Sequence, residues 1–450
     1  MTDAPVALPR VRPRPAAFGL RGALLFAFVA GAIIVSGLVQ GWNTALLIVN
    51  FGLVSAIMAL GVNLQWGFAG LFNIGVMGFV ALGGLAAVLV GMPPTTEAIA
   101  AGGLRMLGAL LLGAAIVALA VFTWKGAFPL PRRLRGPAVL AILVLGFYAF
   151  RALFDPAVAV IEAVNPAGTG YLGGLGWPVI LAWPIGGLLA AGAAWLIGKT
   201  ALGLRADYLA IATLGIAEIV IAVLKNEDWL SRGVKNVVGV PRPVPYEVDL
   251  QADPGFVERA ASLGLDPVTA STLWVKVLYA GLFAAVLAIL LVLAQLALNS
   301  PWGRMVRAIR DNEVAAEAMG KDVTARHLQI FVLGSAILGV AGAMMTTLDS
   351  QLTPTAYQPL RFTFLVWVMV IVGGSGNNFG AVLGGFVIWI LWVQVEPVAL
   401  WAVSLATETM GPGLLRDRLI ESAAHMRLLT MGVVMLLVLR FAPKGLIPER

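Results

Sequence analysis

Cysteine is absent from the 450 residues, and histidine occurs only twice, as His327 and His425. Without cysteine the chain can form neither disulfides nor thiolate metal sites, and it has no cysteine nucleophile. Two histidines far apart in the sequence also argue against a multi-histidine metal centre. We therefore expect no metal site, no bound cofactor and no catalytic residue.

Charged residues are scarce as well. They make up 12% of the chain, against about 25% in soluble globular proteins, whereas apolar residues make up 60% against about 45–50%. So few polar side chains cannot cover the surface of a water-soluble globule. The composition predicts an all-α polytopic membrane protein with roughly ten to twelve transmembrane helices. The formal charge of +7 is dispersed among apolar segments, so we expect no nucleic-acid partner.

The apolar runs place the expected helices, because a helix needs about 20 mostly apolar residues to cross a bilayer. The first run is longer than the roughly 7–15-residue core of a signal peptide, so we expect it to stay as the first helix. Residues 1–19, which are rich in Pro and Arg, are predicted to form a disordered cytoplasmic arm before a transmembrane domain over 20–450. The candidate spans are 20–40, 44–64, 68–91, 104–124, 138–154, 178–197, 208–224, 273–298, 328–348, 362–373, 380–395 and 428–441.

The distribution of charge predicts the orientation, since Lys and Arg in short loops favour the cytoplasm. With the N-terminus inside and twelve crossings, 18 of the 30 Lys and Arg residues fall inside, whereas 15 of the 23 Asp and Glu residues fall outside. This asymmetry favours an even number of crossings and two cytoplasmic termini. Segment 226–272 then lies outside, with room for an amphipathic helix near 256–263, and segment 299–327 lies inside.

The inside segment contains a basic amphipathic stretch. Pro301 suits a helix start and Gly320 a helix stop, so we predict one short helix between them that is too polar to enter the membrane. Its apolar positions lie near helical spacing, with Arg304, Arg307 and Arg310 beside them. Spacing alone leaves two interpretations: a helix resting on anionic lipid headgroups, or a docking element for a cytoplasmic partner.

Two groups of polar residues interrupt the apolar spans. Glu218 lies in a predicted span, where a charge costs roughly 2.5–3.5 kcal/mol, so it either lines a permeation path or bonds to a neighbouring helix. Asn63, Gln65 and Asn73 belong to a glycine-containing stretch that can meet a polar solute where a helix breaks. The alternative for these amides is close helix packing with interhelical hydrogen bonds.

The sequence Gly198-Lys199-Thr200 resembles the end of a phosphate-binding loop. The upstream glycine, Gly192, is one position too far away, and the motif follows an apolar helix rather than a strand. We therefore expect no ATPase site in this chain and interpret Lys199 as an anchor at the inner membrane face.

Several stretches, taken together, resemble one family. The segment that begins at Glu313 and ends at Gly320 is similar to the EAA-type loop of ABC importer permeases. The chain as a whole resembles the M-type permease subunit of branched-chain amino-acid importers. The stretches that carry the resemblance are Ala59-Leu-Gly-Val-Asn-Leu-Gln-Trp-Gly-Phe-Ala-Gly70, Thr213-Leu-Gly-Ile-Ala-Glu218, Gly233-Val-Lys-Asn-Val-Val-Gly-Val-Pro241, Val372-Gly-Gly-Ser-Gly-Asn-Asn-Phe-Gly-Ala-Val-Leu-Gly384 and Phe441-Ala-Pro-Lys-Gly-Leu-Ile447.

The resemblance implies a subunit of a larger assembly in the bacterial inner membrane. Its partners would be a second permease subunit, two cytoplasmic ATP-binding subunits and a periplasmic solute-binding protein. Segment 226–272 becomes periplasmic and segment 299–327 becomes the cytoplasmic coupling loop. By the same resemblance, an ATPase groove receives the helix with Glu313, Ala315, Ala316 and Gly320. The arginines before it pair with acidic groups of the ATPase or with lipid.

The substrate stays open at this stage. The resemblance implies branched-chain or other small amino acids, with urea or short amides as alternatives. Residues 91–136 contain a pair of segments that look additional to the family pattern. A stand-alone secondary transporter is the competing class, and it would normally couple to an ion through carboxylates inside the membrane, of which Glu218 is the clear candidate.

Overall fold

A computed structural model describes residues 19–408, 413–423 and 425–449. The prediction of a disordered arm over 1–19 falls almost entirely outside the described residues. The prediction of an all-α membrane protein is confirmed, since the only strands of the described part are the two-residue β1 (Val237–Val238) and β2 (Gln351–Leu352), which pair antiparallel.

Nine helical segments of the described residues are long and apolar enough to cross a membrane. A tenth is counted if α18 (Leu414–Ala423) and α19 (Met426–Phe441), which bend by 58° where they meet, form one span. The nine are Leu20–Gln40 (α1), Trp42–Phe68 (α2 and η1), Thr96–Lys125 (α4, η2 and α5), Arg132–Ala163 (α6), Val179–Ala201 (η3 and α7), Ala206–Asn226 (α8), Pro267–Asn299 (α12), Val323–Asp349 (α15) and Asn378–Ala406 (α17).

Other helices are shorter. Among these, α3 (Val76–Gly91) and α16 (Pro359–Gly373) are apolar, and α13 (Pro301–Asp311) and α14 (Glu313–Ala318) form the inside segment. The remaining short elements, and the parts of the composite spans, are α2 Trp42–Val62, η1 Asn63–Phe68, α4 Thr96–Ala98, η2 Ile99–Gly103, α5 Leu104–Lys125, η3 Val179–Leu181, α7 Ala182–Ala201, α9 Asp228–Ser231, η4 Gly233–Lys235, α10 Glu247–Ala252, α11 Pro254–Ser262 and η5 Pro354–Ala356.

The core of the bundle lies where α2, α3, α7 and α15 pack together. Small residues let these helices approach backbone to backbone. A Cβ on Gly83 of α3 would overlap the carbonyl oxygen of Gly339 on α15, and one on Gly342 would overlap the backbone of Val80. Glycine is therefore needed at these positions by the closeness of the neighbouring helix.

Each predicted span overlaps a helix, but two details of the prediction are wrong. The run 68–91 was expected to be one helix, whereas residues 69–75 are not helical and α3 begins at Val76. One helix was expected between Pro301 and Gly320, whereas the chain forms α13 and α14. Asn312 separates them, because its side chain accepts a hydrogen bond from the Ala315 N–H and begins a new helix.

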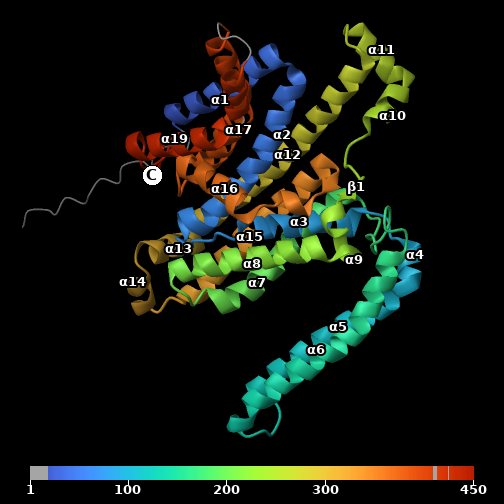
Figure 1. The fold of residues 1–450 in the computed structure, drawn as a ribbon. Helices are drawn as coiled ribbons and strands as arrows, with labels where there is room; N and C mark the ends of the chain where they lie inside the picture. The colour runs from blue at the N-terminus through green and yellow to red at the C-terminus, as the bar shows by residue number, and fades with distance from the viewer. Residues whose placement is uncertain (1–18, 409–412, 424, 450) are drawn as a thin grey trace, which may run out of the picture.

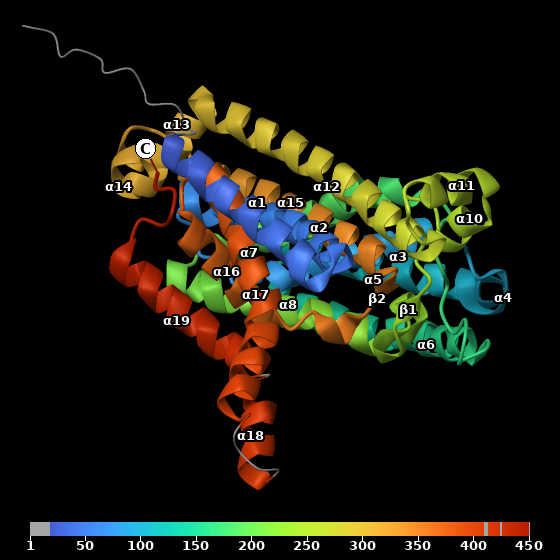
Figure 2. The same cartoon turned by 90° about the horizontal axis from the view of Figure 1, so that it is seen from above.

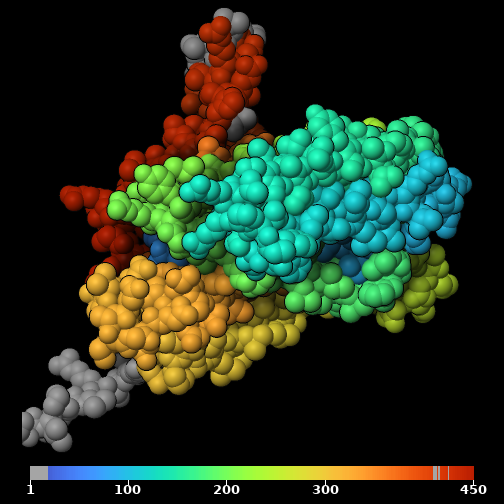
Figure 3. Space-filling view, turned by 90° about the horizontal axis from the view of Figure 1, so that it is seen from below, coloured from blue at the N-terminus to red at the C-terminus, as the bar shows by residue number. Residues whose placement is uncertain are grey.

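Helices α5 and α6 form a hairpin that extends away from the bundle (Figure 1; Figure 3, in cyan). The two helices pack mainly against each other, for example where Ile116 lies against Gly146. Their other faces are apolar and exposed, including Leu111 and Leu145. The stretch 91–136 that the sequence marked as additional contains α5 and only the first residues of α6.

The two long hydrophilic segments lie at opposite ends of the molecule. Helices α13 and α14 lie at the end where the described chain finishes, and α10 and α11 lie at the other end (Figures 1 and 2). The β1–β2 pair ties the outer segment to the end of α15. The amphipathic helix expected near 256–263 is α11, which begins with Asp253 accepting a hydrogen bond from the Gly255 N–H.

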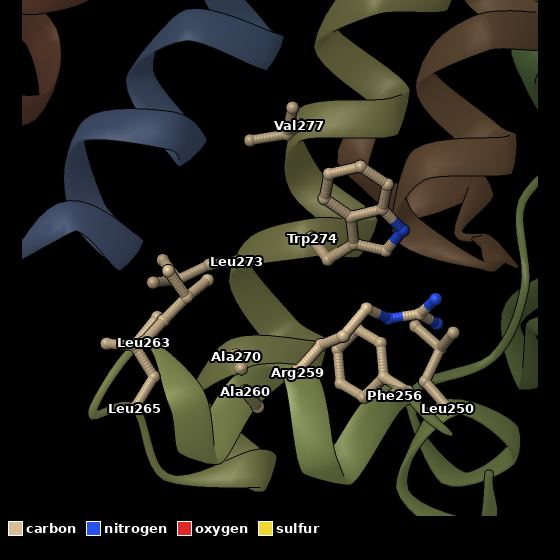
Figure 4. A pocket seen from close by; sticks show the side chains of 10 residues that line it. All are labelled: Leu250, Phe256, Arg259, Ala260, Leu263, Leu265, Ala270, Leu273, Trp274 and Val277. Atoms are coloured by element: carbon tan, nitrogen blue, oxygen red, sulfur yellow. The ribbon is translucent and has the colours of Figure 1, made fainter. Parts of the chain in front are cut away.

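Helices α10 and α11 and the start of α12 enclose a groove of about 550 Å³ (Figure 4). Apart from the Arg259 side chain its lining is apolar, with Phe256 and Trp274 as the largest side chains. Asp266 begins α12 by accepting a hydrogen bond from the Thr269 N–H, so the groove lies where this long apolar helix starts.

Candidate translocation and coupling sites

The break after α2 is held by Asn63, which is fully buried. Its Nδ2 donates to Oδ1 of Asn378 at 3.0 Å, and its Oδ1 accepts the Gly376 N–H at 2.9 Å. Gly376 has φ +78°, a conformation that favours glycine. One amide therefore joins the end of α2 to the turn between α16 and α17, 313 residues further along the chain.

Gln65 and Asn73 extend this connection to α15. Gln65 Nε2 donates to the Phe331 carbonyl at 2.9 Å and to Ser335 Oγ at 3.0 Å, while its Oε1 accepts from Asn73 Nδ2 at 2.8 Å. Asn73 Oδ1 accepts the Gly75 N–H at 2.8 Å. We call Asn63, Gln65 and Asn73 the polar hub. Its amides are buried and bonded to protein groups, as buried amides in a low-dielectric interior require.

Glu218 is in a different setting, on the exposed side of α8. The opposite side of α8, with Thr213 and Ala217, is buried against the bundle. Glu218 makes no hydrogen bond or ion pair with any residue in the described parts of the chain, so no neighbouring helix of this chain satisfies it. The carboxylate lies about 12 Å from the end of α8 at Asn226, at 1.5 Å per helical residue.

The inside segment turns sharply at both ends. Gly303 lies against the backbone of Leu298, where a Cβ would collide, so the chain can fold back directly after α12. At the other end Gly320 has φ +76°, which supports the interpretation that it lets the chain turn back after α14. Ile309 and Ala316, which lie between these turns, pack against Val323 at the start of α15 and give the loop a small apolar core.

The outer face of this loop is partly apolar. Val314 is 76% exposed and Met319 is 79% exposed, and Glu313, Ala315 and Gly320 are exposed beside them. Ala316, by contrast, points into the loop's own core. Val314 and Met319 are both large apolar side chains exposed on a short amphipathic segment, which makes this face a candidate contact for another molecule.

The three arginines of the loop have different surroundings. Arg304 is exposed and donates only to the Asn299 carbonyl at 3.5 Å, and Arg307 is half-buried and donates to the Leu298 carbonyl at 3.2 Å. Arg310 reaches the body of the protein, where it contacts Gly67 and Glu449. Burial lowers the pKa of Arg310, but its hydrogen bonds and charge attraction to Glu449 and Asp311 outweigh burial and leave that pKa raised.

The C-terminal residues also belong to this site, although the sequence marked Leu446 and Ile447 only as part of a family stretch and gave them no role here. The N–H groups of Leu446 and Ile447 each donate at 2.9 Å, to the carbonyls of Val372 and Gly373. Asn377 Nδ2 donates to the Pro448 carbonyl at 3.3 Å. Asn377 and Asn378 stood inside a conspicuous Gly- and Asn-rich stretch, which was a usable signal, whereas Glu449 had none.

Two further expectations concern catalytic and metal chemistry. Gly198-Lys199-Thr200 occupies the last turn of α7, where the Lys199 ammonium lies 3.9 Å from the centroid of the Trp195 ring. Among the described residues, no three His, Cys, Asp or Glu side chains are grouped as they would be to hold a metal ion.

The sequence matches one family of transport permeases. Residues 138–439 match the family described as "Branched-chain amino acid transport system / permease component". The chain is 28% identical over 313 residues to the high-affinity branched-chain amino acid transport system permease protein LivM of Escherichia coli (strain K12). It is 27% identical over the same length to its counterpart in Salmonella typhimurium. These matches cover 68% of this chain and 64% of each relative.

A third relative is the probable branched-chain amino acid transport permease protein LivM of Methanocaldococcus jannaschii, 31% identical over 156 residues, or 34% of this chain and 41% of that protein. The chain thus spans slightly less than two thirds of the bacterial relatives that it matches. No solved structure matches.

Proposed function

The chain belongs to the family of branched-chain amino acid transport permeases, and on that premise we propose that it is one membrane subunit of an ATP-driven importer. It is a multi-pass membrane protein of a transport family rather than of an enzyme family. In this proposal ATP hydrolysis takes place on two separate cytoplasmic subunits, and a second permease and a periplasmic binding protein complete the complex.

The observation that carries the proposal is the outer face of the loop formed by α13 and α14. Val314 and Met319 are among the most exposed apolar side chains in a segment that is otherwise polar. Lipid headgroups would cover the basic side of such a loop, but they do not explain apolar side chains on a compact turn with its own core. A groove on an ATPase subunit that accepts these apolar side chains explains why they are exposed in the isolated chain. Ala315 and Gly320 leave room for close approach, and Glu313 lies at the rim.

This assignment implies an orientation of the chain in the membrane. The end with α13 and α14 is cytoplasmic, and the C-terminal residues up to Glu449 lie at the same end (Figure 2). The outer segment 226–272 is then periplasmic and receives the binding protein. With an even number of crossings the N-terminus is cytoplasmic too, and the bilayer is the bacterial inner membrane.

The exposed side of α8 is the part of this chain that we assign to the translocation path. Ile211 and Ile219 are 69% and 64% exposed there, and Gly215 has no atom within 4 Å of its Cβ position. An unpaired carboxylate on such a face is costly in lipid, so a second permease subunit and water are the surroundings that suit Glu218. The polar hub holds the helix break behind this face rather than meeting the solute directly.

ATP-driven motion of the partners would shift the two permeases between inward-facing and outward-facing states. The family favours branched-chain or other small amino acids as the solute, with urea or short amides as alternatives. Selectivity in this proposal rests largely with the binding protein.

Co-purification tests the proposal. The tagged chain is expressed in its native host, and the amount of ATP-binding subunit recovered with it is measured. We expect Val314→Arg and Met319→Arg to abolish recovery of the ATPase, because a charge enters an apolar contact. Thr324→Arg, which adds the same charge at an exposed polar position next to the loop, is the matched control and should recover the ATPase normally. Ion-driven uptake by the purified chain alone, without any ATPase, would contradict the proposal.

A further inference from the structure

Arg310 of the coupling loop reaches the transmembrane body through its side chain and makes charged hydrogen bonds there, whereas Val306 and Trp302 of the same loop pack against the core. Its Nη1 donates to the Gly67 carbonyl at 2.6 Å and to Glu449 Oε2 at 2.9 Å. Its Nε and Nη2 donate to Asp311 Oδ1 at 3.2 and 3.1 Å. The Arg310 side chain is 23% exposed, so it points into the protein rather than toward a cytoplasmic partner.

The first of these contacts lies at the helix break. Gly67 belongs to η1, and the chain leaves the helix after Phe68. The Gln65 and Trp66 carbonyls of this last turn accept the N–H groups of Leu71 and Gly70, whereas the Gly67 carbonyl accepts a side-chain donor. Arg310 supplies that donor, and it is charged. A Cβ on Gly67 would collide with Oδ1 of Asn63, so the same residue also touches the polar hub.

The second contact lies at the turn between α16 and α17. Glu449 Oε2 is 2.7 Å from the position of a Cβ on Gly376, whose N–H is bonded to Asn63. The residues before Glu449 are bonded to the carbonyls of Val372 and Gly373 and to the side chain of Asn377. The C-terminal segment is thus hydrogen-bonded to this turn, and Arg310 pairs with Glu449 of that segment.

We propose that Arg310, Gly67 and Glu449 form a strut that transmits movement of the coupling loop to the helix break and to the α16–α17 turn. The inference rests on the proposed function, because it needs a moving partner at α13 and α14. In this inference Arg310 is a positioning residue, and it does not belong to the surface that binds the ATPase.

The geometry explains why an arginine is needed. A partly exposed ion pair is by itself a weak connection. The guanidinium has several donors in a fixed plane, so it can hold a carbonyl of one segment and a carboxylate of another at the same time. A lysine can keep the charge attraction to Glu449, but it cannot reproduce both contacts with the same orientation.

The test separates transport from ATP hydrolysis in the complete complex reconstituted in lipid. Four variants are compared with the unmodified chain: Arg310→Gln, Arg310→Lys, Glu449→Gln and, as the matched control, Arg133→Gln, at an exposed arginine of α6 outside the coupling loop. We expect Arg310→Gln to lower uptake on the order of tenfold while the ATPase rate per complex stays within about twofold. Arg310→Lys and Glu449→Gln should give smaller losses of uptake, and Arg133→Gln should leave uptake and hydrolysis unchanged.

Two results would contradict the proposal that the contacts of Arg310 transmit movement. If Arg310→Gln lowers the recovery of ATPase in the complex in parallel with uptake, Arg310 is a docking contact. If Arg310→Gln and Glu449→Gln both transport normally, the contacts transmit nothing. Should Arg310→Gln fail to fold, Arg310→Lys and Glu449→Gln carry the same test. Failure of the unmodified chain to assemble with an ATPase would instead defeat the proposed function, so the two failures are distinguishable.

Discussion

The α2–η1 span and helix α6 are similar in hydropathy and opposite in surroundings. The most apolar window of Trp42–Phe68 has a mean hydropathy of 2.3 and 78% of its residues are buried, whereas that of Arg132–Ala163 has 2.0 and 6%. Apolar character therefore tells only that both segments can lie in a membrane. What separates them is small residues and amides placed where another helix comes close.

This difference bears on function. The buried spans carry the polar hub and contact the coupling loop, while the α5–α6 hairpin packs mainly on itself. Its exposed faces are mainly apolar, which suits a lipid environment, and the charges of Arg151 and Asp155 on α6 pair with each other. The matched family segment starts at residue 138, inside α6, so α5 lies outside it. We expect the hairpin to tolerate changes that the buried spans cannot.

The largest difference in stability between the buried bundle and the hairpin should come from substitution of one glycine in each. Gly342→Leu places a side chain into the backbone of Val80, so we expect a loss of more than about 3 kcal/mol and little folded protein. Gly108→Leu, on α5 where nothing lies within 4 Å, is expected to fold normally. Size-exclusion profiles in mild detergent measure both. Equal behaviour of the two variants would mean that α3 and α15 are not in close contact.

A smaller difference in stability is expected when one leucine in each region is replaced by alanine. Leu338 on α15 is completely buried, and Leu338→Ala should destabilise the protein by about 2–5 kcal/mol through the cavity it leaves. Leu145 on α6 is 69% exposed, and Leu145→Ala should stay within about 0.5 kcal/mol of the unmodified chain. Thermal unfolding in lipid nanodiscs compares them. A large loss at Leu145 would show that a partner subunit covers the hairpin.

The polar hub should give a loss of intermediate size. Asn63→Leu leaves the Gly376 N–H without its buried acceptor, which costs about 1–3 kcal/mol. Tyr148→Phe, which removes an exposed hydroxyl from the hairpin, should change thermal stability by less than about 0.5 kcal/mol. If Asn63→Leu were as stable as the unmodified chain, the hub would be open to water and would itself belong to the path.

The smallest effect on stability is expected at Glu218, which is exposed like the hairpin but charged. Glu218→Gln should change thermal stability by less than about 0.5 kcal/mol, because no group of the described chain depends on it. Uptake by the complete complex should nevertheless fall about fivefold or more. Unchanged uptake would place Glu218 outside the translocation path.

The sequence predicted the membrane class and the family because these depend on composition and on motif order along the chain. It also identified Gly320 as a turn and α11 as an amphipathic helix. It missed the division at Asn312, although an Asn before Glu313 is a visible helix-start signal. It treated Arg304, Arg307 and Arg310 alike, because spacing cannot tell which arginine lies opposite a carbonyl 243 residues away.

The break over residues 69–75 shows a second limit. Its residues are apolar enough to continue a helix, and the run to Gly91 therefore suggested one. The chain departs from helical geometry because Gln65 bonds to Phe331 and Ser335 and because the Trp367 indole N–H donates to the Asn73 carbonyl. These partners come from distant helices, so a local pattern does not contain them.

Helix α15 has its first residue beside the coupling loop and its last beside β2, which is paired with the outer segment. Its 27 residues form one continuous helix of about 40 Å that contains no proline. A tilt imposed at one membrane face must therefore displace the opposite face as well. In the importer that we propose, binding of a loaded receptor at the outer face would therefore reach the ATP-binding subunits at the inner face through this one helix, before the solute has moved.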